Sequence, residues 1–295
     1  MKKLVTLVFA ITSLTSLSIN KVKEEHGMTG LEISSFISYK DLKNNNLEQS
    51  NLRNKYFVID SINKNLYKKL KIDNSDKEYV YNLSLNRLMD ERDTIYNYDF
   101  MLGMNIDEFW RVGINVSYAD LRNTPGDLFQ GNLFSKWSNG EDTTFISSIY
   151  GGTYKEKEQS SENYFGITNK FEKEYLDFDE VTYIPYVQFN YGSIEKNKSL
   201  YTELGFGIEK IIYEEWSNYD KFITPKITFG AGHEFLDGDK YKDLGKDEFA
   251  TQIFTRVEIP IKINTFEVSP VSSFSKSIVN SNFETSVGIN FKYSF

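Results

Sequence analysis

The chain has 295 residues, a formal net charge of −8 and no cysteine, so disulfide frameworks, zinc–thiolate sites and cysteine nucleophiles are excluded. The acidic balance argues against nucleic-acid binding, which normally requires a basic face. Mean hydropathy is −0.46 although 16% of the residues are aromatic, a combination too polar for a helical membrane protein but suited to a membrane β-barrel, whose strands are apolar on one face only.

The amino-terminal residues have the features of a secretory signal. Lys2 and Lys3 precede an apolar run, Leu4 to Leu17, which is too short to span a membrane comfortably. No apolar run of about twenty residues, the length of a membrane-spanning helix, follows it. We therefore predict a signal peptide over residues 1–20 and export of the mature chain.

Residues 21–77 form an amino-terminal segment with mixed signals. Alternating apolar residues predict a strand from Leu31 to Tyr39, and the Asn-rich stretch 41–54 predicts a loop. Between Lys55 and Leu70 a short strand at residues 56–59 is favoured, but one helical stripe also fits, formed by Ile59, Ile62, Leu66 and Leu70. The whole segment is expected to act as a plug, a linker or two extra strands.

From residue 78 onward, apolar and polar side chains alternate in a way that predicts a series of strands. Twelve are expected, at residues 79–85, 96–106, 112–118, 133–137, 145–154, 164–171, 181–191, 200–212, 223–231, 249–263, 266–274 and 283–295. We predict an all-β fold, a transmembrane antiparallel up-and-down β-barrel over residues 78–295. It should have about 12 strands, or about 14 if the amino-terminal segment adds two, because bacterial barrels have even numbers.

The connections between these strands alternate in length, as they do in membrane barrels. Those expected on the periplasmic side are short and lie at Asp107, Asn139 and Asn264. Those expected outside are longer and more polar: Leu121–Gln130, Lys155–Asn163 and Asp237–Asp247. Two expected periplasmic connections are not short: Glu172–Glu180 and Glu214–Lys221.

One face of many consecutive strands carries charged or amide side chains. In a barrel, this solvated face lines the lumen. The residues expected there are Arg111, Asn115, Glu203, Glu209, Lys226, Arg256, Glu258, Glu284 and Lys292.

The last strand has the clearest alternation, with polar or small residues at even positions and apolar or aromatic residues at nearly all odd positions. A soluble β-sandwich also contains such strands, but this ending resembles the assembly signal of bacterial outer-membrane proteins. The residues of the expected signal are Val287, Ile289, Phe291, Tyr293 and Phe295.

Several stretches between Tyr79 and Phe295 carry a family resemblance. They are Tyr98–Asn105, Arg111–Tyr118, Tyr183–Tyr191, Leu204–Gly207, Thr224–Phe229 and, as the best match, Val287–Phe295. Together they resemble the translocator β-domain of autotransporters. The resemblance implies a bacterial outer-membrane protein whose partners are outer-membrane lipid and the barrel-assembly machinery, which reads the terminal strand.

The chain departs from that family in one respect. Only residues 21–78 lie between the expected signal peptide and the matched region, so we expect no sizeable passenger. The expected function is that of a barrel resembling a translocator domain. A passive, porin-like channel for small solutes is the first alternative, and an outer-rim enzyme or cation-binding surface barrel is the second.

The second alternative depends on titratable residues near the expected outer rim. His233 precedes several acidic residues and could pair with one of them to activate water. The weak candidates for a metal site are Asp237, Asp239 and Asp243, since carboxylate oxygens bind Ca²⁺. An acidic surface loop is the simpler interpretation, so we expect no catalytic residues, no cofactor and no metal, and no role for His26.

Overall fold

The structure is a computed structural model that describes residues 27–41, 59, 62–67, 69–70, 78–89, 94–122, 126–140, 142–156, 161–176, 181–194, 197–216, 219–237, 251–278 and 283–293. The expected signal peptide, His26 and Phe295 lie outside the described residues. Within these ranges, no helix has the length and apolar character needed to cross a membrane.

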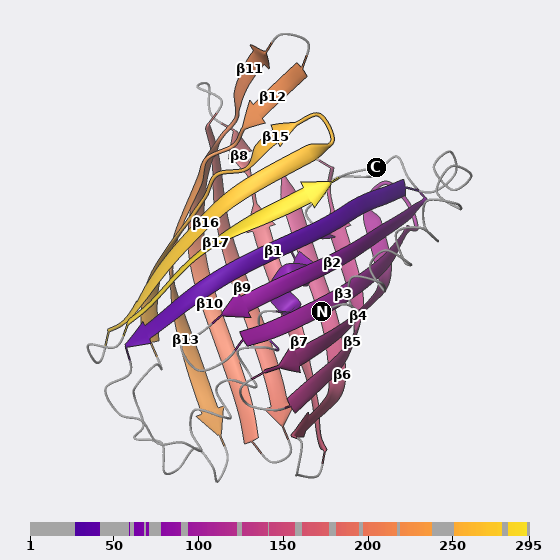
Figure 1. Ribbon diagram of the computed structural model, residues 1–295, viewed down its shortest axis with the longest axis vertical. Coiled ribbons are helices and arrows are strands. Elements are labelled where there is room, and N and C mark those ends of the chain that lie inside the picture. The colour runs from indigo at the N-terminus through magenta and orange to yellow at the C-terminus, as the bar shows by residue number, and fades with distance from the viewer. Residues whose placement is uncertain are drawn as a thin grey trace.

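In the described part of the chain, seventeen strands form one continuous sheet that closes on itself, as the tilted strands of Figure 1 show. They are β1 (Gly27–Asp41), β2 (Tyr79–Met89), β3 (Thr94–Asn105), β4 (Trp110–Leu121), β5 (Gly126–Ser138), β6 (Thr143–Glu156), β7 (Glu162–Lys173), β8 (Tyr175–Leu176), β9 (Val181–Ile194), β10 (Asn197–Lys210), β11 (Ile212–Trp216), β12 (Tyr219–Ile223), β13 (Lys226–Asp237), β14 (Thr251–Glu258), β15 (Ile261–Ile263), β16 (Phe266–Ser277) and β17 (Phe283–Tyr293). Thirteen of them make the barrel wall, and the short β8, β11, β12 and β15 extend it. The predicted all-β barrel is thus confirmed.

The strand number differs from the expected even value because of β1. This strand pairs antiparallel with β17, from Leu31 beside Tyr293 to Asp41 beside Phe283, and parallel with β2. All other neighbouring pairs that the structure describes are antiparallel. A single parallel pair allows an odd number of strands to close, so the wall has thirteen strands where the sequence predicted about 12, or about 14 with two extra strands.

Of the strand expected at residues 56–59, only Ile59 lies within the described residues, and it is helical. Residues 59, 62–67, 69 and 70 are helical and lie inside the barrel, where Figure 1 shows a coiled ribbon behind β1 to β3; they are called the lumen helix below. The helical stripe prevails because its side chains are buried, with Ile59 at 3% exposure and Ile62, Leu66 and Leu70 at 0%. A helix also satisfies its backbone hydrogen bonds internally, so it needs no strand partner.

The two faces of the wall are inverted relative to a soluble protein. Large apolar side chains point outward, with Leu133 and Leu204 each 64% exposed, whereas Ser117 and Gln130 point inward and are fully buried. A soluble sandwich buries its apolar faces, so this arrangement excludes that alternative. An apolar exterior around a polar interior is the arrangement of a membrane barrel.

The terminal strand follows the same rule. Val287, Phe291 and Tyr293 are 55%, 38% and 44% exposed on the outer face, while Asn290 is 7% exposed and faces the lumen. The alternation predicted for this strand therefore gives it one apolar outer face and one polar inner face.

Two of the expected outer connections contain strand residues at both ends. β4 continues to Leu121 and β5 begins at Gly126, while β6 continues to Glu156 and β7 begins at Glu162. Polar residues in these stretches misled the prediction because some line the lumen: Gln130, for example, is buried inside the barrel. Of the third connection, Asp237–Asp247, only the backbone of Asp237 is described, as the last residue of β13.

The opposite end of the barrel has the tight turns that the sequence predicted. Between β5 and β6, Gly140 has a φ of 78° and the Asn139 side-chain oxygen accepts hydrogen bonds from the backbone nitrogens of Asp142 (3.0 Å) and Thr143 (2.8 Å). Side-chain hydrogen bonds from Asn139 and Thr143 hold the pKa of Asp142 below its ordinary value. The longer connection Glu214–Lys221 at this end is mostly the β11–β12 hairpin, which prolongs the wall.

Candidate functional site in the barrel lumen

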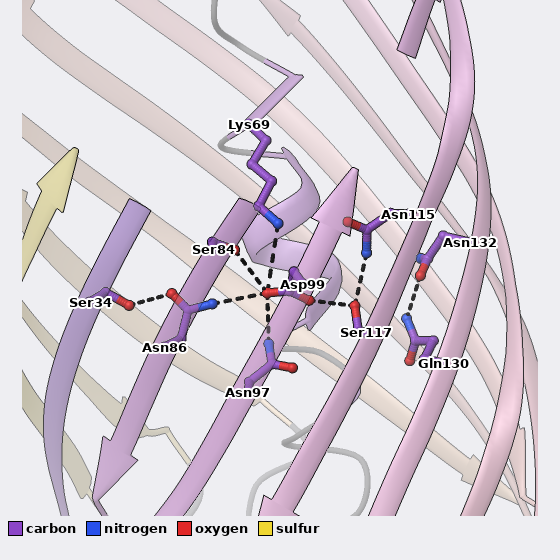
Figure 2. A network of polar contacts seen from close by, with 10 residues as sticks. All are labelled: Ser34, Lys69, Ser84, Asn86, Asn97, Asp99, Asn115, Ser117, Gln130 and Asn132. Atoms are coloured by element: carbon purple, nitrogen blue, oxygen red, sulfur yellow. Dashed lines mark hydrogen bonds and ion pairs between the residues drawn. The ribbon is translucent and has the colours of Figure 1, made fainter. Parts of the chain in front are cut away.

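Polar side chains from several strands converge on Asp99 of β3, inside the barrel (Figure 2). Its Oδ2 accepts hydrogen bonds from Ser84 Oγ (3.1 Å), Asn86 Nδ2 (2.9 Å) and Asn97 Nδ2 (2.9 Å). Its Oδ1 accepts one from Ser117 Oγ. The carboxylate is only 1% exposed, so these donors replace the water that a buried anion has lost.

The lumen helix contributes the matching cation. Figure 2 shows Lys69 extending from the helix toward Asp99, with Nζ 3.7 Å from Oδ2 and both side chains 1% exposed. This distance is in the range of an ion pair but too long for a hydrogen bond, and Lys69 Nζ has no hydrogen-bond partner among the described residues. The buried ammonium therefore depends on Asp99 for its compensation.

Two further polar side chains attach the helix to other strands. Asn63 Oδ1 accepts hydrogen bonds from Gln130 Nε2 and Asn132 Nδ2 of β5, both at 3.0 Å. The Tyr67 hydroxyl lies 2.5 Å from Thr168 Oγ1 of β7. Asn63 and Tyr67 are four residues apart and so share one side of the helix, which is fixed to β5 and β7 along that side.

Apolar packing reinforces these contacts in two layers. In the first, Ile59 and Ile62 pack into a buried cluster that includes Leu128. In the second, Leu66 and Leu70 pack into another that includes Met101 and Phe134. All the wall residues of both clusters come from β2 to β9: Leu88, Ile95, Ala119, Leu121, Leu128, Tyr150, Tyr154, Tyr164 and Ile194 in the first, and Val80, Met101, Phe134 and Ile146 in the second.

The sequence analysis missed this site, although a signal for it was present. Met101, Leu128 and Phe134 occupy lumen-facing positions where the alternation calls for polar side chains. Apolar side chains on a solvated face indicate that another part of the protein packs against them.

The opposite side of the lumen carries an ion pair between Glu203, which is buried, and Arg256, which is partly exposed. The guanidinium meets the carboxylate at two points, Nη1 to Oε1 at 3.0 Å and Nη2 to Oε2 at 3.1 Å. The hydroxyls of Tyr186 (2.6 Å) and Tyr201 (2.7 Å) also donate to this carboxylate. Lys64 of the lumen helix adds an electrostatic attraction to Glu203.

The lumen-facing residues predicted from the sequence are largely confirmed. Arg111, Asn115 and Glu203 are 5%, 1% and 1% exposed inside the barrel. Lys226 and Glu209 form an ion pair with Nζ 3.1 Å from Oε2.

Of the residues considered for rim chemistry, the structure describes the surroundings of His233 and Glu234 only. His233 Nδ1 lies 2.7 Å from Thr251 Oγ1, and its ring stands edge-on to Phe235 at 4.2 Å. Glu234, its neighbour in the strand, lies on the other face of the wall, where it accepts a hydrogen bond from Ser199. The side chains of Asp237, Asp239 and Asp243 lie outside the described residues. Within the described part of the chain, no group of three or more possible metal ligands occurs.

Comparisons with known proteins support the fold. No protein-family model matches the sequence, and no curated protein matches it. The β-domain of the Bordetella autotransporter BrkA has a TM-score of 0.50 to this structure, with 10% sequence identity over 69% of this chain and 91% of that one. The chain thus shares the β-barrel fold of an autotransporter β-domain.

Two other solved barrels are similar at lower scores. LpxR from Salmonella typhimurium has a TM-score of 0.46 and 8% identity, over 68% of this chain and 88% of that chain. The translocator domain of NalP from Neisseria meningitidis has a TM-score of 0.35 and 10% identity, over 69% of this chain and 81% of that chain. At these scores neither carries an argument about what this chain does.

Proposed function

We propose that this chain is an outer-membrane β-barrel of the autotransporter-translocator type that is closed at rest by its own lumen helix. The observation that carries the proposal is the double attachment of that helix, by the Lys69–Asp99 ion pair and by two buried apolar clusters. Ile62, Leu66 and Leu70 are fully shielded from solvent, so helix and wall are in close contact along this side of the lumen. In this proposal Asp99 holds the helix and takes part in no catalysis.

The proposed location rests on the outer face of the wall and on the fold. Apolar side chains such as Leu133, Ile149 and Phe165, each at least 60% exposed, would contact lipid. The proposed partners are outer-membrane lipid and the barrel-assembly machinery, which would read Val287 to Phe295. These partners are consistent with the apolar outer face of β17.

A passive channel is the second candidate, and one observation favours it. Charged side chains on β10, β13 and β14 retain contact with solvent inside the barrel: Arg256 is 35% exposed, Glu209 25% and Lys226 21%. Solutes could pass along this side if the lumen helix moved away from it.

Fractionation and planar-bilayer recording test the proposal together. The protein should enter the outer-membrane fraction, require detergent for extraction and migrate differently on gels before and after heating. In bilayers it should conduct only in rare, brief openings. Recovery as a soluble periplasmic monomer would contradict the proposed location, and a stable open conductance would favour the passive channel.

The proposed assembly partner has its own test in Phe295→Ser. Loss of the aromatic terminus should slow or abolish assembly in cells while refolding in detergent stays nearly normal, because the assembly machinery that would read this residue acts only in cells. Assembly in cells at normal abundance would show that the terminal residue is not read.

A further inference from the structure

β1 differs from every other wall strand in its connection to the rest of the barrel. The wall strands from β2 to β17 follow one another as a series of antiparallel neighbours. β1, in contrast, is separated from β2 by residues 42–78 and runs parallel to it. Removing β1 would therefore leave twelve wall strands as one antiparallel series, with the described hairpins intact.

The two strands that flank β1 are suited to pair with each other. β17 is antiparallel to β1 and β2 is parallel to it, so β17 and β2 are antiparallel to one another. Ser34 lies beside both Asn290 of β17 and Asn86 of β2, and all three are buried in the lumen, at 2%, 7% and 6% exposure. Direct pairing of β17 with β2 at this level would keep polar residues inside and apolar residues outside.

The seam between β17 and β2 is nevertheless shaped to receive β1. Gly288 of β17 faces Phe36 of β1, and a Cβ atom at Gly288 would lie 2.2 Å from the Phe36 ring and 2.7 Å from the Ser35 carbonyl oxygen. Only glycine leaves this space for the ring. On the other side, Ser34 Oγ donates a hydrogen bond to Asn86 Oδ1.

We propose that the seam between β17 and β2 is a strand-binding site whose occupant is β1 of the same chain, and that the barrel closes both with β1, as thirteen strands, and without it, as twelve. The inference rests on the proposed function in that the barrel must be membrane-inserted. Because the lumen narrows as strands are removed, the helix that packs in the thirteen-stranded barrel is displaced in the twelve-stranded one. Withdrawal of β1 is thereby coupled to opening.

Disulfide trapping in the full chain distinguishes the two closures, since the natural sequence has no cysteine. Ile33→Cys with Phe291→Cys reports the thirteen-stranded barrel, because these residues are paired. Leu85→Cys with Phe291→Cys reports the twelve-stranded one. With β1 between them their Cα atoms are roughly 9.5 Å apart, two strand spacings, beyond the reach of a disulfide.

Control pairs on a fixed part of the wall calibrate the cross-linking. Phe100→Cys with Val116→Cys joins neighbouring strands and should always react. Leu83→Cys with Val116→Cys has β3 between its members and should not react. Leu83→Cys and Arg87→Cys, each combined with Phe291→Cys, cover a register shift of two residues at the new seam.

Gly288→Ala should shift the balance between the closures, because its methyl group takes the space of the Phe36 ring. Adding Phe36→Ala should restore only part of the original balance, because it removes the contact with the ring but leaves the Ser35 carbonyl oxygen 2.7 Å from the added methyl group. Heat-modifiability on the same gels shows whether each variant still forms a barrel, and the cross-links in the otherwise natural sequence test the proposal even if Gly288→Ala fails to fold.

In lipid vesicles under mild oxidation, Ile33/Phe291 should cross-link as completely as Phe100/Val116. Leu85/Phe291 or a shifted pair should exceed the Leu83/Val116 background, rise severalfold with Gly288→Ala and fall again with Phe36→Ala. The proposal is overturned if the cross-links between β2 and β17 stay at the Leu83/Val116 background in every variant. It is also overturned if the Ile33–Phe291 disulfide forms only between two chains, because the occupant of the seam would then be a second copy. Failure of the proposed function would instead appear as a wild-type channel that is stably open, whatever the cross-links.

Discussion

The two sides of the lumen compensate their buried charges in different ways. On the side formed by β2 to β9, the Asp99 carboxylate faces a lysine of the lumen helix. On the side formed by β10 to β17, the Glu203 carboxylate is held directly by Arg256 of the wall, and Lys64 of the helix adds an electrostatic attraction. The first side is thus complete only when the helix is present, whereas the second has its direct partners within the sheet.

Apolar packing between the lumen helix and the wall is also found on the side formed by β2 to β9. Both buried clusters that contain helix residues draw their wall residues from β2 to β9. The difference teaches that one half of the barrel is a surface for binding the helix and the other half is a self-sufficient wall. Mutations that remove equal energy from the two halves should therefore have unequal effects on opening.

The largest difference is expected for Asp99→Ala. This change leaves Lys69 as an uncompensated buried charge and removes the acceptor of four wall donors, at a cost of about 3–5 kcal/mol. Part of this loss falls on the attachment of the helix, so openings in planar bilayers should become frequent. Lys69→Met combined with Asp99→Asn should be milder, because no buried charge remains.

Glu203→Ala is the matched change on the other side. It leaves Arg256, which is 35% exposed, without its carboxylate partner and should lower the free energy of barrel unfolding by less than Asp99→Ala does, yet leave the channel mostly closed. If Glu203→Ala opens the channel as often as Asp99→Ala, the two sides do not differ as described.

A somewhat smaller effect is expected for Leu66→Ala. The side chain is fully buried between helix and wall, and truncation of such a leucine costs about 2–5 kcal/mol. Because only the helix-to-wall contact is lost, the open probability should rise while urea unfolding of the wall strands changes little. Leu204→Ala, at a 64% exposed outer position away from the helix, should leave the open probability unchanged.

The outer and inner faces of β17 can be compared with lysine substitutions. Val287→Lys, Ile289→Lys and Phe291→Lys place a charge on the outer face, and each should cost about 2–4 kcal/mol near the bilayer midplane and less toward the interfaces. Ser286→Lys and Asn290→Lys put the same charge into the polar lumen and should cost much less. Equal costs on both faces, measured by unfolding in lipid vesicles, would contradict the assignment of inside and outside.

Strand periodicity made most of the wall predictable from the sequence. In β17, for example, a period of two places Val287 and Phe291 outside and Asn290 inside without knowledge of any neighbour. The odd strand number could not be predicted in this way, because it depends on the parallel pairing of β1 with β2. That pairing is a long-range contact with no local signal.

The candidate site was less predictable for a related reason. Residues 56–70 contain both a strand pattern and a helical stripe, and local preference does not decide between them. The helix is favoured because its apolar residues Ile62 and Leu66 pack inside the barrel against apolar residues of distant strands, which are Met101, Leu128 and Phe134. The sequence likewise did not distinguish Asp99 from other polar residues of the wall, because its pairing with Lys69 is a contact between distant parts of the chain.

The smallest predicted effect concerns Asp142, in the turn between β5 and β6. Its pKa in the folded barrel is below the ordinary value of 3.8, so the ionised carboxylate favours the folded state above that pH. This contribution should disappear as the pH falls through the lowered pKa. Wild-type and Asp142→Asn barrels should therefore differ slightly in unfolding midpoint at pH 7 and converge under acid, and a difference that grows under acid would contradict the sign.

Reversible tethering of the lumen helix tests most directly whether that helix closes the barrel. Asn63→Cys with Asn132→Cys replaces one hydrogen-bonded contact between helix and β5 by a disulfide that a reductant can break. In single-channel recordings the oxidised protein should stay closed, and reduction should produce openings because the helix has then lost this contact. Channels that conduct equally in the oxidised and reduced states would show that the helix does not close the lumen.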